Sequence, residues 1–452
     1  MKYLISALII LQYFQVQSQD CFSAGLLLFN QEALEESVSE YPECRIVNGN
    51  LVVLSEVTDL SPLNNIEVVR GRLSIKTGAV SLSGLESVDS IYGDLIIESN
   101  EMLVDLSAIN NIKYIGGDLV IKNNPLIIQA PSFSDLVSFT GSKIEVEGNE
   151  SLQNLPFILN VSSFEGDLII SNTSLINLEG LENWESISNI YILNNMNLQS
   201  VSGLDNLISI NGELKLENNL LLETLSFNSL RTLDVLNISS QKNIKFMEFN
   251  QLEFLNGDII LTDDYDLEIL NLPKLKELGG ELRITDSKSL TEISLAEVIK
   301  IKGEVSIRKC EKLINLNLSK VDSILGGISL VETNLSTLLF PSLKYALGIE
   351  VRKNLININS IDFSKLEHIA ESLFITESYI EGDLLLGKLD TIGSGLVING
   401  VPGLTTFSTS VKFIGGSLGI NENLDLTSII FSELGEVSEG ISIKTNHSLY
   451  RI

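Results

Sequence analysis

Three acidic residues recur at a spacing that could bring their carboxylates together. Asp258, Glu281 and Glu304 are 23 residues apart, and each follows a glycine and precedes an apolar residue. If these segments stack as adjacent strands, the three carboxylates lie about 5 Å apart on one outer face. Such a row could bind Ca²⁺ or raise the pKa of its own members. Three solvated carboxylates that point away from one another are the simpler interpretation. We favour it and predict no metal site here.

The other residues that could do chemistry form no catalytic set. The two histidines, His368 and His447, lie in different repeats and lack partner motifs. The acidic run DDYD at 263–266 lacks the rest of a calcium-binding loop. The chain contains no H-E-x-x-H, no phosphate loop and no paired-cysteine metal motif. We therefore expect no enzyme activity and no cofactor; a groove lined by carboxylates or arginine would reopen the question.

The first residues and the net charge indicate an extracellular protein. Lys2 precedes the apolar run LISALIILQYF, and the residues that follow fit cleavage of a signal peptide near Ser18. No later stretch reaches the roughly 20 apolar residues of a membrane span, and the chain ends in NHSLYRI without a hydrophobic tail. A formal net charge of −29 disfavours nucleic acid and anionic membranes as partners, because both repel an acidic surface. We expect a secreted protein, either free or associated with a cell surface or wall.

Three cysteines follow the signal segment. Cys21 and Cys44 flank one short segment, and in an oxidising compartment we expect them to pair. Cys310 then has no partner. It is either a free or intermolecular thiol or an inert, half-buried side chain, and we favour the inert residue.

A glycine followed by alternating apolar residues recurs almost to the end of the chain. Early copies lie 22 to 25 residues apart, with the weaker SKIEV (142–146) in one slot: GNLVV (49–53), GRLSI (71–75), GDLII (93–97), GDLVI (117–121) and GDLII (166–170). Later copies include GELKL (212–216), GDIIL (257–261), GELRI (280–284), GEVSI (303–307) and GSLGI (416–420). We count about 18 units. The period of two predicts a half-buried strand, with Leu119 and Ile121 pointing inward and Val120 outward.

Each strand is expected to end in a corner. An Asn or Asp recurs three residues past the strand, at Asn100, Asn124, Asn195, Asn219, Asp264, Asn354, Asn423 and Asn446. Asn accepts left-handed backbone and can hydrogen-bond along stacked turns. Next come apolar residues spaced by three, such as Leu103, Leu106 and Ile109, which suit short strands and bends better than a helix. Units this short must stack around one core. They predict an all-β parallel solenoid; a leucine-rich-repeat horseshoe is the rival, disfavoured because helical periodicity is missing.

The N-terminal segment DCFSAGLLLFNQEALEESVSEYPECRIVNGNLVV (20–53) carries a more specific signal. A cysteine, an amphipathic helix, a second cysteine and a G-N-L-x-V strand resemble the opening of the receptor L domains of the insulin and epidermal growth factor receptors. The repeats are also similar to those of fungal cell-wall surface proteins with L-domain-like coils. The resemblance implies a right-handed β-helix, with a Cys21–Cys44 disulfide that clamps a capping helix across the first coil. The chain lacks the receptors' cysteine-rich module, membrane span and kinase, so signalling is not carried over.

The expected organisation follows. Residues 1–18 are a signal peptide, 19–43 an N-terminal cap with helix and disulfide, and 44–452 a continuous solenoid or two or three fused L domains. Seven N-x-S/T sequons are candidate glycosylation sites, at Asn149, Asn160, Asn172, Asn237, Asn317, Asn334 and Asn446.

The outward position three residues after each repeat glycine indicates where a partner binds. Early units place there Val52, Ser74, Ile96, Val120, Glu145, Ile169 and Tyr191. Later units place there Lys215, Asn237, Ile260, Arg283, Ser306, Ser329 and Glu350. Exposed aliphatic side chains on a flat sheet often mark a binding face, and in the receptors that the chain resembles the ligand contacts this face. The candidate partner-binding residues are therefore Val52, Ile96, Val120, Ile169 and Tyr191, although β-propensity alone also places such residues on tolerant surfaces.

These observations favour a non-catalytic binding module, secreted or at the cell surface, whose outer sheet recognises an extracellular protein or glycan. The alternative is a structural component of a cell wall or extracellular matrix, in which the length of the solenoid matters more than any site.

Overall fold

The computed structural model describes residues 20–157 and 162–452. The signal peptide expected over 1–18 and the sequon at Asn160 lie outside these residues. The described chain is nearly all β, with 4% helix, and its parallel strands form a β-solenoid of about 18 turns, as the repeat predicted. It consists of two compact units, unit 1 (Met1–Leu207) and unit 2 (Ile208–Ile452).

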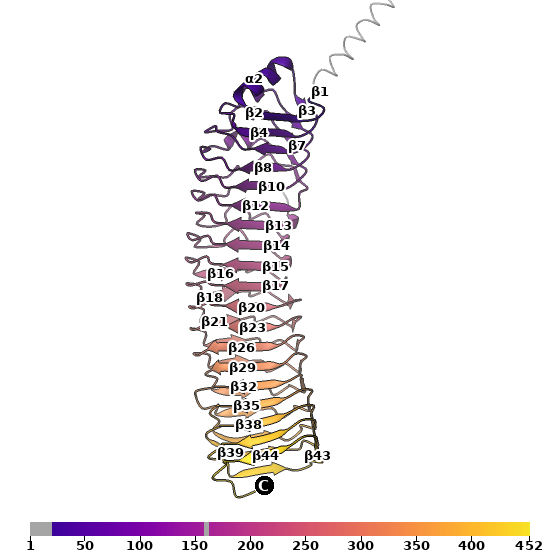
Figure 1. The fold of residues 1–452 in the computed structure, drawn as a ribbon, viewed down its shortest axis with the longest axis vertical. Coiled ribbons are helices and arrows are strands. Elements are labelled where there is room, and N and C mark those ends of the chain that lie inside the picture. The colour runs from indigo at the N-terminus through magenta and orange to yellow at the C-terminus, as the bar shows by residue number, and fades with distance from the viewer. Residues whose placement is uncertain (1–19, 158–161) are drawn as a thin grey trace, which may run out of the picture. The chain divides into compact units, whose positions relative to one another are not determined.

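Unit 1 contains two parallel sheets, and most turns contribute one strand to each (Figure 1). The main sheet of unit 1 consists of β2 (Leu26–Asn30), β4 (Leu51–Glu56), β6 (Leu73–Ile75), β8 (Leu95–Glu98), β10 (Leu119–Lys122), β12 (Lys143–Glu147), β13 (Ser163–Ser171) and β14 (Ser186–Leu193). The second sheet consists of β1 (Asp20–Cys21), β3 (Ile46–Val47), β5 (Val68–Val69), β7 (Ser90–Ile91), β9 (Tyr114–Ile115) and β11 (Ser138–Phe139). The helical segments are α2 (Gln31–Glu40) and the 3₁₀ turns η1 (Ser61–Leu63) and η2 (Ser107–Ile109).

Unit 2 repeats the same plan with a main sheet, a row of two-residue strands that precede its strands in most turns, and shorter sheets on another face. The main sheet of unit 2 consists of β15 (Ser209–Glu217), β17 (Thr232–Ser239), β20 (Ile259–Thr262), β23 (Leu282–Thr285), β26 (Val305–Cys310), β29 (Ile328–Thr333), β32 (Ile349–Arg352), β35 (Leu373–Thr376), β38 (Leu396–Asn399), β41 (Leu418–Asn421) and β44 (Ile441–Lys444).

The two-residue strands of unit 2 are β19 (Phe254–Leu255), β22 (Glu277–Leu278), β25 (Lys300–Ile301), β28 (Ser323–Ile324), β31 (Tyr345–Ala346), β34 (His368–Ile369), β37 (Thr391–Ile392), β40 (Phe413–Ile414) and β43 (Glu436–Val437). The shorter sheets are formed by β16 (Thr224–Ser226), β18 (Phe246–Glu248), β21 (Ile269–Asn271), β24 (Glu292–Ser294) and β27 (Asn315–Asn317); by β30 (Thr337–Leu339) and β33 (Ser360–Asp362); and by β36 (Gly382–Leu386), β39 (Leu404–Thr409) and β42 (Ser428–Phe431).

The alternation of apolar residues orients the main-sheet strands as predicted. Leu119 and Ile121 are fully buried, whereas Val120 between them is half-buried on the outer face. The apolar residues spaced by three also face the core, because Leu103, Leu106 and Ile109 are all buried. Part of that segment is a 3₁₀ turn, η2, and not only strands and bends. A spacing of three is the period of a 3₁₀ turn, so the pattern fits this element.

Each main-sheet strand ends in a corner built from a left-handed residue and a buried polar residue. The sequence predicted left-handed backbone at the recurrent Asn, and this was wrong by one position. The left-handed residues are Ser99 and Asn123, with φ of 59° and 54°, and each directly precedes a recurrent Asn, Asn100 or Asn124. The Asn side chains turn inward and are fully buried. The Nδ2 of Asn100 donates to Asn124 Oδ1 at 2.7 Å, and Asn124 donates in the same way to Asn149 at 3.2 Å. This ladder satisfies backbone groups that the corner would otherwise leave buried and unpaired.

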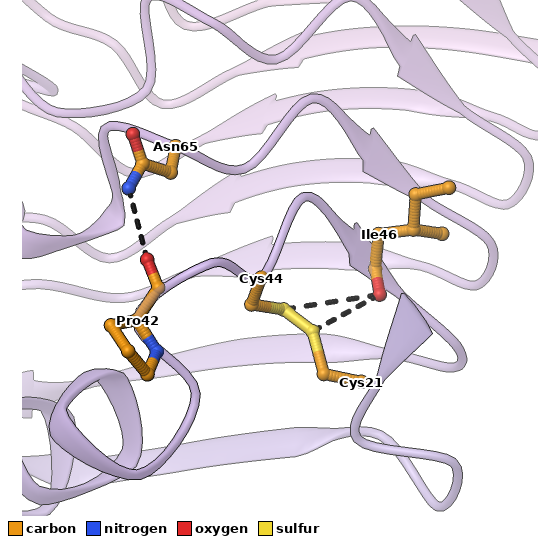
Figure 2. Close-up of a disulfide and its surroundings, with 5 residues drawn as sticks. All are labelled: Cys21, Pro42, Cys44, Ile46 and Asn65. Carbon is orange, nitrogen blue, oxygen red and sulfur yellow. Dashed lines mark hydrogen bonds between the residues drawn. A yellow bond between two sulfur atoms is a disulfide. The ribbon is translucent and has the colours of Figure 1, made fainter. Parts of the chain in front are cut away.

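Helix α2 and a disulfide lie at the N-terminal end of unit 1 (Figures 1 and 2). Asn30 caps the helix by accepting a hydrogen bond from Ala33 N at 2.8 Å, and Leu34 on its inner face is fully buried. Cys21 and Cys44 form the predicted disulfide, with their Cα atoms 5.9 Å apart and the helix within the closed loop. That α2 caps the solenoid core remains a prediction.

Figure 2 shows both disulfide sulfurs beside the carbonyl oxygen of Ile46, at 3.3 Å from Cys21 and 3.9 Å from Cys44. A disulfide sulfur carries no proton, so we regard both as close contacts. The hydrogen bond from Asn65 Nδ2 to the Pro42 carbonyl, at 3.2 Å, ties the loop after the helix to the next turn.

Candidate functional site

The strand register places the predicted partner-binding residues in one row on the outer face of the unit 1 main sheet. Each outward residue pairs with the next across adjacent strands, in the order Val52, Ser74, Ile96, Val120, Glu145, Ile169 and Tyr191. All of them are half-buried. The sequence therefore identified one continuous row, and the fold brings its members to the spacing of adjacent strands, about 4.8 Å.

Two residues that the sequence analysis missed extend this row at its start. Leu27 pairs in register with Val52, and Phe29 lies two residues further along the same strand, so it points to the same side. Each is 57% exposed, more than any residue predicted for the row. Residues 19–43 were assigned to a cap, whereas 26–30 form the strand β2. The continuous apolar run Leu26–Phe29 after Gly25 was the signal that could have revealed this strand.

An ionic cluster interrupts the row at Glu145. Lys143 Nζ lies 2.7 Å from one carboxylate oxygen of Glu145, and Lys122 Nζ contacts Glu145 at 3.2 Å and Glu147 at 2.8 Å. Burial alone would raise the pKa of Glu145, but hydrogen bonds led by that from Lys143 outweigh it and hold the pKa below its ordinary value. Glu145 is therefore a fixed anion, and it separates an apolar surface that ends at Val120 from the pair Ile169 and Tyr191.

We call the part of the row before this cluster the N-terminal apolar strip; it consists of Leu27, Phe29, Val52, Ile96 and Val120. Five adjacent strands at about 4.8 Å give it a length of about 19 Å. Ser74, the remaining outward residue, lies between Val52 and Ile96.

The three recurrent carboxylates of unit 2 lie directly before the adjacent strands β20, β23 and β26, as their spacing predicted, and two of them have separate partners. Asp258 Oδ1 accepts a hydrogen bond from the backbone N–H of Glu281 at 2.8 Å, and Glu281 forms an ion pair with Arg283 at 2.9 Å. Within the described residues no group of three or more His, Cys, Asp or Glu side chains could hold a metal ion.

The histidines do not come together with other candidate residues. His368 is exposed, with Nδ1 2.9 Å from Thr391 Oγ1, and His447 is exposed in a different turn. Cys310 is fully buried, deeper than predicted, and burial raises the pKa of its thiol to about 11. Cys310 directly follows the left-handed residue Lys309, so it occupies the corner position that Asn holds in other turns. A buried, protonated thiol fits the inert residue that we favoured.

The acidic run at 263–266 forms a corner. Asp263 is left-handed, and Asp264 is fully buried in the ladder position, where its Oδ1 accepts a hydrogen bond from Gln241 N at 3.0 Å. Its Oδ2 is buried without a hydrogen-bond partner, and burial raises the pKa of Asp264 to about 7.

The sequons differ in accessibility. Asn149 is fully buried, and its Nδ2 donates to the Ile121 carbonyl at 2.8 Å, so the fold has no room for a glycan there and this candidate is no longer expected to be modified. Asn172 and Asn317 are exposed. The side chains of the remaining described sequons are half-buried, at Asn237, Asn334 and Asn446.

Among the described residues, no helix combines the length and apolar character needed to cross a membrane. No model of a known protein family matches the chain, and a search of curated proteins finds no relative of it.

Proposed function

We propose that this protein is a secreted or cell-surface binding module without catalytic activity, which recognises an extracellular partner through the outer sheet of its solenoid. The N-terminal apolar strip is its principal contact surface, and a protein is the partner that fits this strip best. The observation that carries the proposal is the strand register that aligns these outward apolar side chains and begins with Leu27 and Phe29, each 57% exposed.

The composition of the strip favours a protein partner. Its members are aliphatic or aromatic, and they form a row about 19 Å long on the outer face of one sheet, an extended surface that suits contact with a protein. Clustered apolar anchors surrounded by charged residues are typical of protein interfaces. The flanking charges are present here as Arg72 and Lys76 on one turn and Glu98 on the next.

Two further features support this surface over others on the sheet. No sequon occurs before Asn149, so no N-linked glycan is attached within the strands that carry the strip. The equivalent positions of unit 2 are mostly polar or charged, beginning with Lys215 and Asn237 in register. The disulfide in unit 1 fits an extracellular location.

The test begins with the fraction of the source culture that holds the protein, tagged after residue 18: medium, a salt-releasable surface pool or a detergent-resistant residue. Purified protein is then added back to cells. We expect saturable rebinding, and we expect Leu27→Asp and Val120→Asp each to weaken it at least tenfold, because a charge is placed in a desolvated contact. Val137→Asp is the control, since this residue is 76% exposed but precedes β11 of the second sheet. Recovery only in the detergent-resistant residue would favour the structural alternative.

A further inference from the structure

Unit 2 contains a groove on its main sheet that the repeat alone does not predict. It has a volume of about 220 Å³ and runs over β26, β29, β32 and β35, beside the last of the three recurrent carboxylates. Its lining includes three carboxylates, one guanidinium, two hydroxyls and one aromatic ring: Glu304, Glu350, Glu371, Arg308, Ser329, Ser372 and Phe374.

Two glycines open the groove. The position directly before the first inward residue of the strand holds Glu304 in one turn, but Gly327 and Gly348 in the next two. A Cβ on Gly327 would meet nothing closer than 3.6 Å, and one on Gly348 nothing closer than 3.4 Å. Neither glycine has a positive φ. The backbone therefore does not require glycine at these two positions, and what their missing side chains provide is space.

The wall of the groove is a fixed polar network. Arg308 Nη2 donates to Ser329 Oγ at 2.9 Å, and Ser329 Oγ donates in turn to Glu350 Oε2 at 2.8 Å. Ser329 is only 5% exposed, and Arg308 also bonds to the buried Ser306 at 3.3 Å. Because these side chains hold one another, little side-chain entropy is lost when a ligand binds to the remaining N–H groups of Arg308.

The ends of the groove supply acceptors and an apolar face. Glu304 and Glu371 form no hydrogen bond or ion pair through their side chains within the described residues, and Glu371 Oε2 lies 3.8 Å from the position of a Cβ on Gly348. The ring of Phe374 is 39% exposed and pairs in register with Glu350. One groove thus combines free carboxylate acceptors, a guanidinium donor and an aromatic face.

We infer that this groove binds a neutral saccharide, such as one or two rings of an uncharged glycan. Sugar hydroxyls both donate and accept, so they match a lining that contains free carboxylates and Arg308. The C–H face of a sugar ring can pack on Phe374. The volume is below the roughly 300–1,000 Å³ of sites for drug-sized ligands, which limits the ligand to a short segment.

Other ligand classes fit less well. Three carboxylates against one guanidinium disfavour phosphate, sulfate and acidic glycans. Metal binding is disfavoured because the described residues form no cluster of three metal-ligating side chains. A basic peptide would pair with Glu304 and Glu371, but Arg308 would repel it and leave its own N–H groups unused. The site lies wholly in unit 2 and does not depend on the N-terminal apolar strip.

The test uses the mature full chain and soluble neutral oligosaccharides of glucan, mannan and chitin, with binding measured by saturation-transfer NMR and calorimetry. Gly348→Leu fills the groove without a steric clash in the backbone, and we expect it to weaken binding at least tenfold. Phe374→Ala should weaken it several-fold. The matched control is Gly440→Leu. Gly440 holds the equivalent position in another turn, outside the groove, and a Cβ there would meet nothing within 4 Å.

The inference fails if none of these oligosaccharides binds, or if Gly348→Leu binds them as well as the unaltered protein does. It also fails if a lysine- and arginine-rich peptide binds in their place and Glu371→Gln abolishes that binding. Cleavage of a bound oligosaccharide that Glu371→Gln abolishes would confirm a saccharide site, and it would overturn the proposal that the module is non-catalytic.

Discussion

Replacing Asp264 by Asn is expected to stabilise this protein at neutral pH and to remove part of its pH dependence. Asp264 occupies a ladder position in which Asn is the usual residue. In the equivalent turns Asn Nδ2 donates to the backbone carbonyl of the preceding turn, as Asn124 does to Ile97 at 3.0 Å. The register makes Ile238 the equivalent carbonyl for Asp264. An ionised carboxylate has no proton to donate there, which explains why Oδ2 is buried without a partner.

The magnitude follows from the pKa of Asp264, which burial raises from 3.8 to about 7. A folded-state pKa above the unfolded value means that the native state binds more protons, so stability falls as pH rises from about 4 to about 7 and stays low above that. At 1.36 kcal/mol for each factor of ten, ionised Asp264 destabilises the fold by about 4 kcal/mol at pH 8. About 3 kcal/mol of that loss falls between pH 5 and pH 8. Asp264→Asn should recover most of it at pH 8.

The assay is urea unfolding at pH 5, 6.5 and 8, together with hydrogen exchange of peptides from 236–285, because repeat proteins open locally. The control is Asp266→Asn, which removes a half-buried carboxylate from the same acidic run. The difference between Asp264→Asn and the unaltered protein should rise from about 1.5 kcal/mol at pH 5 to about 4 kcal/mol at pH 8, since other carboxylates contribute equally to both. If the two proteins differ by less than about 0.5 kcal/mol at pH 8, Asp264 is not the strained group that its geometry indicates.

Three further predictions concern the cysteines and the sequons. Replacing Cys21 and Cys44 together by Ser should lower the free energy of unfolding by about 3 kcal/mol, the loop-closure effect for a separation of 23 residues, and should expose α2 to proteolysis; unchanged urea midpoints would contradict this. Cys310 should react with a maleimide only after denaturation, because its thiol is fully buried with a pKa raised to about 11; rapid labelling of native protein at pH 7.5 would show an open corner. Glycopeptide mass spectrometry of secreted protein should find a glycan at the exposed Asn172 and none at the buried Asn149, and full occupancy at Asn149 would refute the ladder in that turn.

The sequence predicted the repeated strand and its inward side chains because packing restricts these positions most strongly. A period of two around a shared core allows few residue types at Leu119 and Ile121, so the pattern survives in most copies. The sequence predicted a corner after each strand, but it placed the left-handed residue one position too late. The left-handed residue can be Ser, Asn, Asp, Lys or Glu, so no single residue type marks it.

The candidate surfaces were harder to predict, for two reasons. The segment that contains β2 was assigned to the cap because of its cysteines and helix, so the strand itself was missed. Its side chains Leu27 and Phe29 extend the outward row. The ionic cluster at Glu145 depends on which lysines lie across adjacent strands, and this requires a register accurate to one residue. The 220 Å³ groove and the burial of Asn149 depend on how neighbouring turns stack, and the sequence analysis predicted neither.

In a solenoid whose inner positions are set by packing, function is best sought where the outward positions depart from the local pattern. Asp258, Glu281 and Glu304 continue one pattern in successive turns, and the structure gives two of them ordinary partners. Gly327 and Gly348 replace the acidic residue of this pattern in the next two turns. The backbone tolerates a side chain at both positions, so local folding does not explain why they are glycine. The same reasoning applies to the start of the unit 1 main sheet, where Leu27 and Phe29 are each 57% exposed and do not belong to the core. Both departures lie on outer faces of main sheets, and both lead to binding experiments in which one substitution can be compared with a matched control.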